Sequence, residues 1–160
     1  MTELGDIAPR FVELAHGIVW STVSTTDPAG RPRSRILHPI WQWDGQELIG
    51  WIITGKTPPK LAQLTHSPYV ACNYWAPTHD TCLAECAAEW VDDLETKTTV
   101  WELFRSTPLP LGYDPAGIGI PGWTGPESPS VSVLRLRPWR LRVLTGKDLS
   151  NGVRATSWRA

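Results

Sequence analysis

The chain has 160 residues, a net charge of −1 and a hydrophobic content of 41%. We expect a single domain over residues 1–160, because this length can bury a substantial core without disulfides or metals. The near-neutral charge gives no support for electrostatic binding to nucleic acid or a membrane surface, and no apolar run is long enough to span a bilayer. We therefore expect neither as a partner.

The three cysteines, Cys72, Cys82 and Cys86, are odd in number, and the sequence shows no secretory signal. Free thiols in a reducing compartment are the simplest interpretation, so we predict a cytoplasmic protein. Cys82 and Cys86 fall within a predicted strand, and no second pair completes a tetrahedral set of ligands. We therefore predict no metal site.

The first third of the chain is typical of a short helix followed by three strands. Residues 8–16 have apolar side chains at helical spacing, and Gly17 fits the position just after a helix end. Strands are predicted over 18–25, 33–41 and 47–54, with turns at Asp27-Pro-Ala-Gly and Asp44-Gly45. Gly50 would leave room for a ligand to approach the third strand.

The rest of the chain alternates between strands and helices. Thr57 and Pro58 fit the N-cap and first position of a helix. Strands are predicted over 69–75 and 81–91, and Asp92-Asp-Leu-Glu resembles a capping box that opens a helix to about 104. A strand over 131–143 is predicted to bulge near Pro138. These elements predict a mainly β fold with short helices, a small closed or split barrel.

Residues 107–129 are rich in proline and glycine and fit no regular element. A loop of this length in a compact domain is usually a site loop or a mobile one. Tyr113 and Trp123 either close over a ligand there or cover a dimer seam. The tail over 146–160 is only weakly patterned, and its Trp158-Arg159 is predicted to dock on a dimer.

Cations and hydroxyls gather around the end of the third predicted strand. Arg33 and Arg35 are two residues apart and therefore share one face of their strand. Thr54, Lys56 and Lys60 follow where the next strand gives way to a helix. Such a group at a strand end and helix start suits a phosphate. On these residues alone, solvated surface charge on a hairpin is the alternative.

Several segments, taken in order, resemble the pyridoxamine 5'-phosphate oxidase-like family of FMN-binding split β-barrels. Residues 22–37, Thr-Val-Ser-Thr-Thr-Asp-Pro-Ala-Gly-Arg-Pro-Arg-Ser-Arg-Ile-Leu, resemble the first hairpin of that family. Thr54 and Lys60 stand where the family has a Thr at a strand end and a Lys in the following helix. Ser67-Pro-Tyr-Val-Ala resembles the start of the next strand. The resemblance covers about residues 8–145 and implies an FMN-binding split β-barrel.

The resemblance also implies a cofactor site. Arg35 and Lys60 would contact the FMN phosphate, and Thr54 would hydrogen-bond the phosphate or the polar edge of the flavin. Arg33 and Ser34 would be neighbours. Pro58 and Pro59 remove two amide donors from the helix start, so more of the phosphate binding would fall to Lys56, Thr57 and Lys60.

The implied activity is two-electron transfer between flavin and a small organic substrate, in a homodimer with flavin sites at the subunit boundary. The flavin performs the chemistry, so we predict no catalytic residue. None of His38, His66 and His79 has an acid and a nucleophile at a suitable spacing. His38 lies on the strand face opposite the two arginines and is expected to be a satisfied structural histidine.

Three other functions are known for proteins with this resemblance. True pyridoxamine 5'-phosphate oxidase activity is not expected, because residues 151–160 lack the Arg-x-x-Asp-Arg and Trp-x-x-x-Arg-Leu-x-Pro segments of that enzyme. A deazaflavin-dependent reductase would use coenzyme F420 and would need a basic groove leading off Lys56 and Lys60. A non-enzymatic stress protein that holds flavin or haem would share the same barrel.

Overall fold

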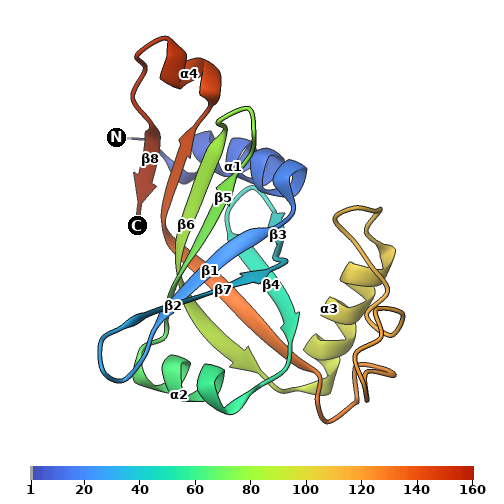
Figure 1. The fold of residues 1–160 in the computed structure, drawn as a ribbon. Coiled ribbons are helices and arrows are strands. Elements are labelled where there is room, and N and C mark those ends of the chain that lie inside the picture. The colour runs from blue at the N-terminus through green and yellow to red at the C-terminus, as the bar shows by residue number, and fades with distance from the viewer. Residues whose placement is uncertain (1) are drawn as a thin grey trace.

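The computed structural model describes residues 2–160 as one strongly coiled antiparallel sheet with helices at its ends and side (Figure 1). The strands are β1 (Ser21–Thr26), β2 (Pro32–Leu37), β3 (Ile40–Trp43), β4 (Leu48–Thr54), β5 (Tyr69–Trp75), β6 (Thr81–Val91), β7 (Ser132–Leu144) and β8 (Thr156–Arg159). The helices are α1 (Leu4–Ile18), α2 (Pro58–His66), α3 (Leu94–Ser106) and α4 (Gly146–Ser150). The predicted mainly β architecture is confirmed.

The sheet order is β2-β1-β5-β6-β7-β4-β3, so β2 and β3 form its two edges and the barrel is not closed. The long strand β7 pairs along its length with β6, while its first part also pairs with β4 and its last part with β8. Glu85 pairs with Arg140 but Cys86 pairs with Pro138, which leaves Trp139 as an extra residue. The predicted bulge near Pro138 is therefore present.

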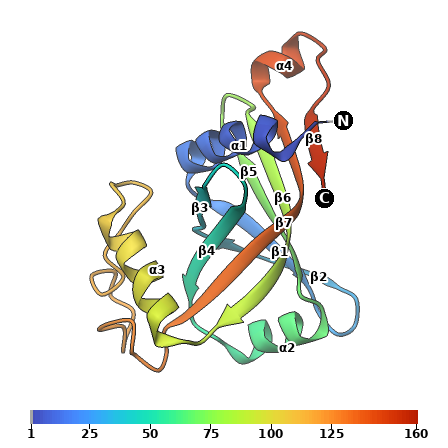
Figure 2. The ribbon, with the colours of Figure 1, turned by 180° about the vertical axis from the view of Figure 1, so that it is seen from behind.

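Helices cover the two ends of the coiled sheet and one of its sides. Seen from both sides, α1 lies across one end, α2 lies beneath the other, and α3 stands beside β4 with the 107–130 loop (Figures 1 and 2). Phe11 of α1 packs edge-on against Trp41, with ring centroids 5.0 Å apart, in the main core. A second core lies around Val100, Trp101 and Phe104 of α3. No helix within residues 2–160 is long and apolar enough to cross a membrane.

The first helix is longer than predicted, because both of its ends are set by contacts that the apolar spacing does not reveal. The Asp6 carboxylate accepts a hydrogen bond from the Glu3 amide at 3.1 Å, which starts the helix at Leu4 rather than Ala8. The predicted stop at Gly17 is wrong. The helix continues to Ile18, and the residue with a positive φ that follows its end is Val19, at 75°.

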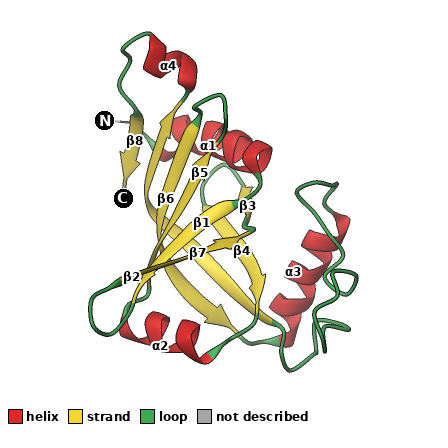
Figure 3. Ribbon diagram, in the orientation of Figure 1, coloured by secondary structure: helices red, strands yellow, loops and turns green. Residues whose placement is uncertain are grey.

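The predicted strand over 33–41 is two strands, β2 and β3, separated by His38 and Pro39. Pro39 has no amide hydrogen and cannot continue the ladder, so the chain turns there from one sheet edge to the other. The expected space at Gly50 is also absent, because a Cβ there would lie 2.6 Å from the Trp41 ring. The weakly patterned tail forms α4 and β8, and β8 adds a strand to the sheet along β7 (Figure 3).

Candidate phosphate and cofactor site

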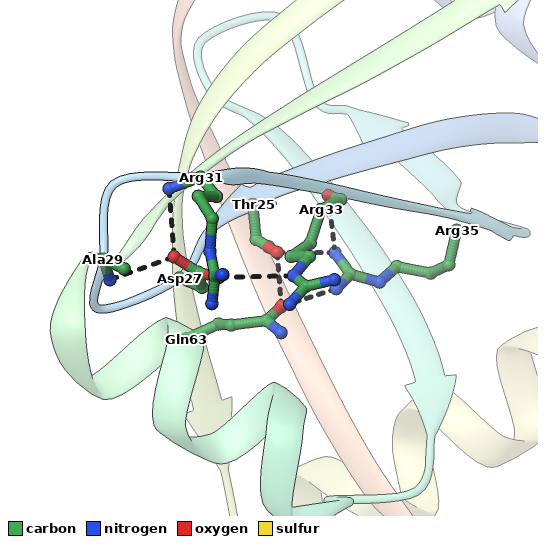
Figure 4. A network of polar contacts seen from close by, with 7 residues as sticks. All are labelled: Thr25, Asp27, Ala29, Arg31, Arg33, Arg35 and Gln63. Carbon is green, nitrogen blue, oxygen red and sulfur yellow. Dashed lines mark hydrogen bonds and ion pairs between the residues drawn. The ribbon is translucent and has the colours of Figure 1, made fainter.

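Arg35 is held by two neutral side chains from other elements (Figure 4). Its Nη1 donates to the Thr25 hydroxyl of β1 at 2.7 Å, and its Nη2 donates to Gln63 Oε1 of α2 at 2.6 Å. The Thr25 hydroxyl also donates to Gln63 Oε1, at 2.6 Å. Gln63 and Thr25 are buried, so they fix the direction of the guanidinium without cancelling its charge.

Lys60, near the start of α2, points back to the end of β4. Its Nζ lies 2.6 Å from the Thr54 hydroxyl and 3.3 Å from the Gly55 carbonyl oxygen. Burial lowers the pKa of Lys60, and the nearby positive charge of Arg35 lowers it further. Burial also lowers the pKa of Arg35, although a guanidinium stays protonated in proteins.

Arg35 and Lys60 thus form a pair of half-buried like charges, here called the cation pair. Neither makes an ion pair with a carboxylate anywhere in residues 2–160. Partly desolvated cations that repel each other are stabilised by an anion placed between them. The geometry therefore suits a phosphate or a similar anion.

The side chains of four predicted site residues make no hydrogen bond with the cation pair: Arg33, Ser34, Lys56 and Thr57. Arg33 is 3.3 Å from Asp27, and it shares that one carboxylate with Arg31, which lies closer at 2.9 Å. Ser34 is exposed and shares a hydrogen bond with Ser24 at 3.0 Å.

Lys56 lies 2.8 Å from Asp92 and 5.2 Å from the centre of the Trp90 ring, so its charge is satisfied locally. Thr57 occupies the N-cap position of α2 but is exposed, and its side chain makes no capping hydrogen bond. The structure thus brings together Arg35, Thr54 and Lys60, and the cofactor role predicted for all seven residues stays a prediction.

The sequence did not reveal Gln63 and Thr25 as residues of the site. Gln63 is three residues after Lys60, so the two share one face of α2. That spacing is visible in the sequence. The pairing of this amide with Arg35 is not visible, because it depends on β2 and α2 meeting in space.

A pocket of about 380 Å³ opens beside Lys60, while Arg35 lines only a smaller pocket of about 20 Å³ that it shares with Lys60. The lining of the larger pocket includes Thr54, Gly55 and Lys60 on one side and Tyr113 and Trp123 of the long loop on the other. A second pocket of about 430 Å³ adjoins it, since both are lined by Leu37, Ile53, Tyr113 and Ile118. Both volumes fall in the range of small-molecule sites. The loop over 107–129 thus lines both pockets, as expected of a site loop.

His38 borders the second pocket, and its ring is buried. Within the described part of the chain its Nε2 has no hydrogen-bond partner, so the expectation of a fully satisfied structural histidine is wrong. Burial lowers the pKa of His38, and a hydrogen bond with the Leu111 backbone acts in the opposite sense.

The three cysteines are free and buried in the core. Across residues 2–160, no three His, Cys, Asp or Glu side chains gather in a way that would hold a metal ion. Burial raises the pKa of the Cys82 thiol to about 12.

Solved structures of other proteins share this fold, although the sequence matches no protein-family model and no curated protein. A protein from Clostridium acetobutylicum related to general stress protein 26 of B. subtilis, of the pyridoxinephosphate oxidase family, superposes with a TM-score of 0.71. The two share 13% identity over 97% of this chain and 95% of the other. An FMN-binding, pyridoxamine 5'-phosphate oxidase-related protein from Nostoc punctiforme gives 0.67 at 14% identity, over 100% and 98%.

This chain has the FMN-binding split-barrel fold. The fold implied by the sequence resemblance is therefore confirmed. A haem-binding protein from Mycobacterium smegmatis has the same split barrel, with a TM-score of 0.65 and 16% identity over 99% of this chain and 59% of that one. Split barrels with different ligands thus share this architecture, and the ligand must be argued from the residues of the site.

Proposed function

We propose that this split-barrel protein binds the phosphate of FMN with Arg35 and Lys60, and that it is a flavin-dependent oxidoreductase acting on a small organic substrate. The observation that carries the proposal is the cation pair, which has no carboxylate partner in residues 2–160 and of which Lys60 lines a ligand-sized pocket. The FMN-binding protein among the structural neighbours adds support.

The residues present fit a flavin phosphate. Arg35 Nη1 donates to the Thr25 hydroxyl and lies 3.4 Å from the Val23 and Arg33 carbonyl oxygens, and Nη2 donates to Gln63. Of its five donors, the Nε hydrogen and the second hydrogen on Nη2 remain for an anion. Lys60 has three donors, and the Thr54 hydroxyl beside it offers another. These charge-assisted hydrogen bonds would hold the phosphate in a partly dry site, where they are strong.

The pocket next to the phosphate would hold the flavin ring. Tyr113 and Trp123 provide flat apolar walls, and Trp123 is buried against the second core, which keeps that wall rigid. A bound flavin supplies the two-electron chemistry. The chain's own residues bind it, orient it and keep water from it, so no catalytic side chain is assigned.

A second copy of the chain would complete the site. Trp20, Ile36 and Ile118 line the second pocket yet are 59%, 60% and 48% exposed. A group of exposed apolar side chains around a pocket is typical of a surface that a partner covers. The proposed assembly is therefore a homodimer, and light scattering on the purified protein should give twice the chain mass.

Two other cofactors compete with FMN. Coenzyme F420 would need a basic groove leading off Lys56 and Lys60, but Asp92 already neutralises Lys56. Haem commonly takes an imidazole ligand, but the unpaired Nε2 of His38 is fully covered by protein and is not open to the adjacent pocket. The absorbance spectrum of the purified protein separates flavin, deazaflavin and haem.

Paired lysine variants test the phosphate site. Lys60→Ala should weaken FMN binding about 10- to 100-fold, because one charge-assisted hydrogen bond contributes about 1.5–3 kcal/mol. Riboflavin lacks the phosphate, so its binding should change little. Lys56→Ala is the matched control, since it removes a cation that Asp92 already neutralises. Titrations of apoprotein with both ligands measure this, and equal losses for both, or none, would refute the proposed site.

A further inference from the structure

The second pocket, here called the apolar pocket, differs from the first in the side chains that line it. The first contains the Lys60 ammonium, whereas the apolar pocket is lined by side chains such as Trp20 and Leu109, together with His38 and Tyr113. Burial lowers the pKa of His38 below its ordinary 6.5, so the imidazole is neutral at pH 7. A pocket of about 430 Å³ with no charged group in its lining favours an uncharged ligand.

Tyr113 stands where the two pockets meet. Leu37, Ile53, Tyr113 and Ile118 line both of them, and Tyr113 alone of these four has a polar side chain. A ligand that extends from one pocket towards the other therefore meets this phenol.

The Tyr113 side chain is held in place by the end of α3. Its amide donates to the Phe104 carbonyl at 3.0 Å, and its ring packs edge-on against the buried Phe104 ring, with centroids 5.2 Å apart. The His38 ring also lies 5.2 Å away. Gly112 allows the loop to approach the helix this closely, because a Cβ there would overlap the Thr107 carbonyl oxygen. The position of the ring is thus fixed by its backbone and by its neighbours.

The hydroxyl of Tyr113 is free and can be reached by a ligand. Four side-chain nitrogens in residues 2–160, His38 Nε2 among them, have no hydrogen-bond partner and are sealed from solvent. The Tyr113 oxygen also has no hydrogen-bond partner in that range, but it is not sealed. Burial raises the pKa of Tyr113 to about 12, so the phenol is protonated at neutral pH and can donate. A half-buried donor without a partner is stabilised by an acceptor on a ligand.

We propose that the apolar pocket binds a flat, uncharged molecule with a carbonyl group, whose oxygen accepts a hydrogen bond from the Tyr113 hydroxyl. The rings of Trp20 and Tyr113 lie 4.8 and 5.2 Å from that of His38 and give the pocket flat walls. A carbonyl suits the donor, because its oxygen only accepts. That this ligand is also the substrate of the flavin rests on the proposed function, whereas its binding does not.

Two probes that differ only at the acceptor test the proposal by calorimetry on the flavin-free, full-length protein. In 2-isopropenylnaphthalene a methylene group replaces the carbonyl oxygen of 2-acetonaphthone, and the shape is nearly the same. Tyr113→Phe keeps the ring and removes only the hydroxyl. It should weaken binding of the ketone about 3- to 10-fold, the contribution of one neutral hydrogen bond, and leave the hydrocarbon unchanged. Tyr69→Phe, at an exposed tyrosine of β5, is the control and should bind both probes as the wild type does.

Two spectroscopic measurements report on the contact itself. The carbonyl stretch of bound 2-acetonaphthone should lie at a lower frequency in the wild type than in Tyr113→Phe, a difference that a merely structural hydroxyl would not produce. In NMR spectra of the wild type, nuclear Overhauser effects should connect the naphthyl protons with Trp20, which lines the apolar pocket and not the first. Effects to Trp123 instead would place the probe in the first pocket and overturn the proposal.

A third probe tests the preference for an uncharged ligand. The anion 2-naphthoate should bind more weakly than the ketone, because burying a charge without a partner is costly. Tighter binding of naphthoate would show that the pocket takes acids and would overturn the proposal. Equal losses for ketone and hydrocarbon in Tyr113→Phe, or no loss for either, would do the same, since the hydroxyl would then not contact the ligand.

A flavin titration of the wild type separates this inference from the proposed function. If the probes behave as expected but FMN does not bind, the proposed function fails and the carbonyl site stands. If FMN binds but Tyr113→Phe does not discriminate between ketone and hydrocarbon, only this inference fails.

Discussion

Nη2 of Arg35 lies 2.6 Å from Oε1 of Gln63, so a buried neutral amide rather than a carboxylate orients this guanidinium. Gln63 is three residues after Lys60 on α2, and one helix face thus supplies a cation and also the residue that orients the other cation. Since an amide does not cancel the charge, the positive charge of Arg35 remains available to an anion.

Replacing this amide by a carboxylate should remove the anion site while keeping the shape. In Gln63→Glu a bidentate ion pair would neutralise Arg35, and FMN binding should weaken about 10- to 100-fold, the loss of one charge-assisted bond. Riboflavin binding should hardly change. Thr65→Glu adds the same charge at an exposed position of α2 and is the control. Titration of the apoproteins with FMN and with riboflavin measures these affinities. A similar loss of FMN affinity in Thr65→Glu would point to long-range repulsion instead.

Gly50 is predicted to be essential for packing rather than for ligand access. A Cβ there would meet three ring carbons of Trp41 at 2.6 to 2.9 Å. Trp41 is buried and cannot move freely, because its Nε1 donates to the Tyr74 hydroxyl at 2.8 Å. Gly50→Ala should therefore lower the free energy of unfolding by about 1–3 kcal/mol.

The matched glycine is Gly17 in α1, where an added Cβ has nothing within 4 Å. Gly17→Ala should raise the free energy of unfolding by about 0.5–1 kcal/mol, because glycine is a poor helix former. Urea unfolding of both variants measures the two effects. Destabilisation of similar size in both would show that the contact with Trp41 is not the cause.

The resemblance to the FMN-binding split barrels implied that Arg35 would meet Thr54 and Lys60. Local patterns predicted most of the strands, because side-chain alternation and helix starts depend on neighbouring residues. They did not predict that Lys56 would leave this group. Its partner, Asp92, is 36 residues away, and only the fold brings the two together. The same holds for Gln63, whose contact with Arg35 joins α2 to a strand 28 residues earlier.

The corner at His38 and Pro39 shows a different limit of prediction from local sequence patterns. The prediction treated residues 33–41 as one strand. Pro39 interrupts the ladder, and the two halves pair with different strands, β1 and β4. The pocket at that corner arises from this change of partner, which alternation does not encode.

The three thiols should be inert in the native protein. Cys72, Cys82 and Cys86 are at most 2% exposed, and burial raises the pKa of Cys82 to about 12. Since the thiolate is the reactive form, a thiol reagent at pH 8 should label none of them within minutes. In guanidinium chloride all three should react. Labelling of a thiol in the native protein would show local opening of β5 or β6.

Stability should fall as the pH drops from about 7.5 to 5.5, because the half-buried His16 and the buried His38 resist protonation. His16 Nε2 accepts a hydrogen bond from the Trp41 amide at 2.9 Å, an interaction that a protonated ring cannot make. Burial lowers the pKa of His16 below its ordinary 6.5, and the nearby His38 lowers it further. Burial likewise lowers the pKa of His38.

Below pH 6.5 the unfolded chain therefore binds more protons than the folded one. The contribution of the two neutral imidazoles to the free energy of unfolding is thus fully present above pH 6.5. It is lost as the pH falls from 6.5 towards the pKa values of the folded state. Carboxylates with lowered pKa, such as Asp27 and Asp148, lose their contribution only below their ordinary 3.8, outside this window. Urea unfolding at pH 7.5 and 5.5 measures the effect. The double variant His16→Gln/His38→Gln keeps an acceptor for Trp41 and cannot titrate, so its stability should vary less between the two pH values. His66→Gln, at an exposed position, should vary as the wild type does. An unchanged pH dependence in the double variant would rule out His16 and His38 as its source.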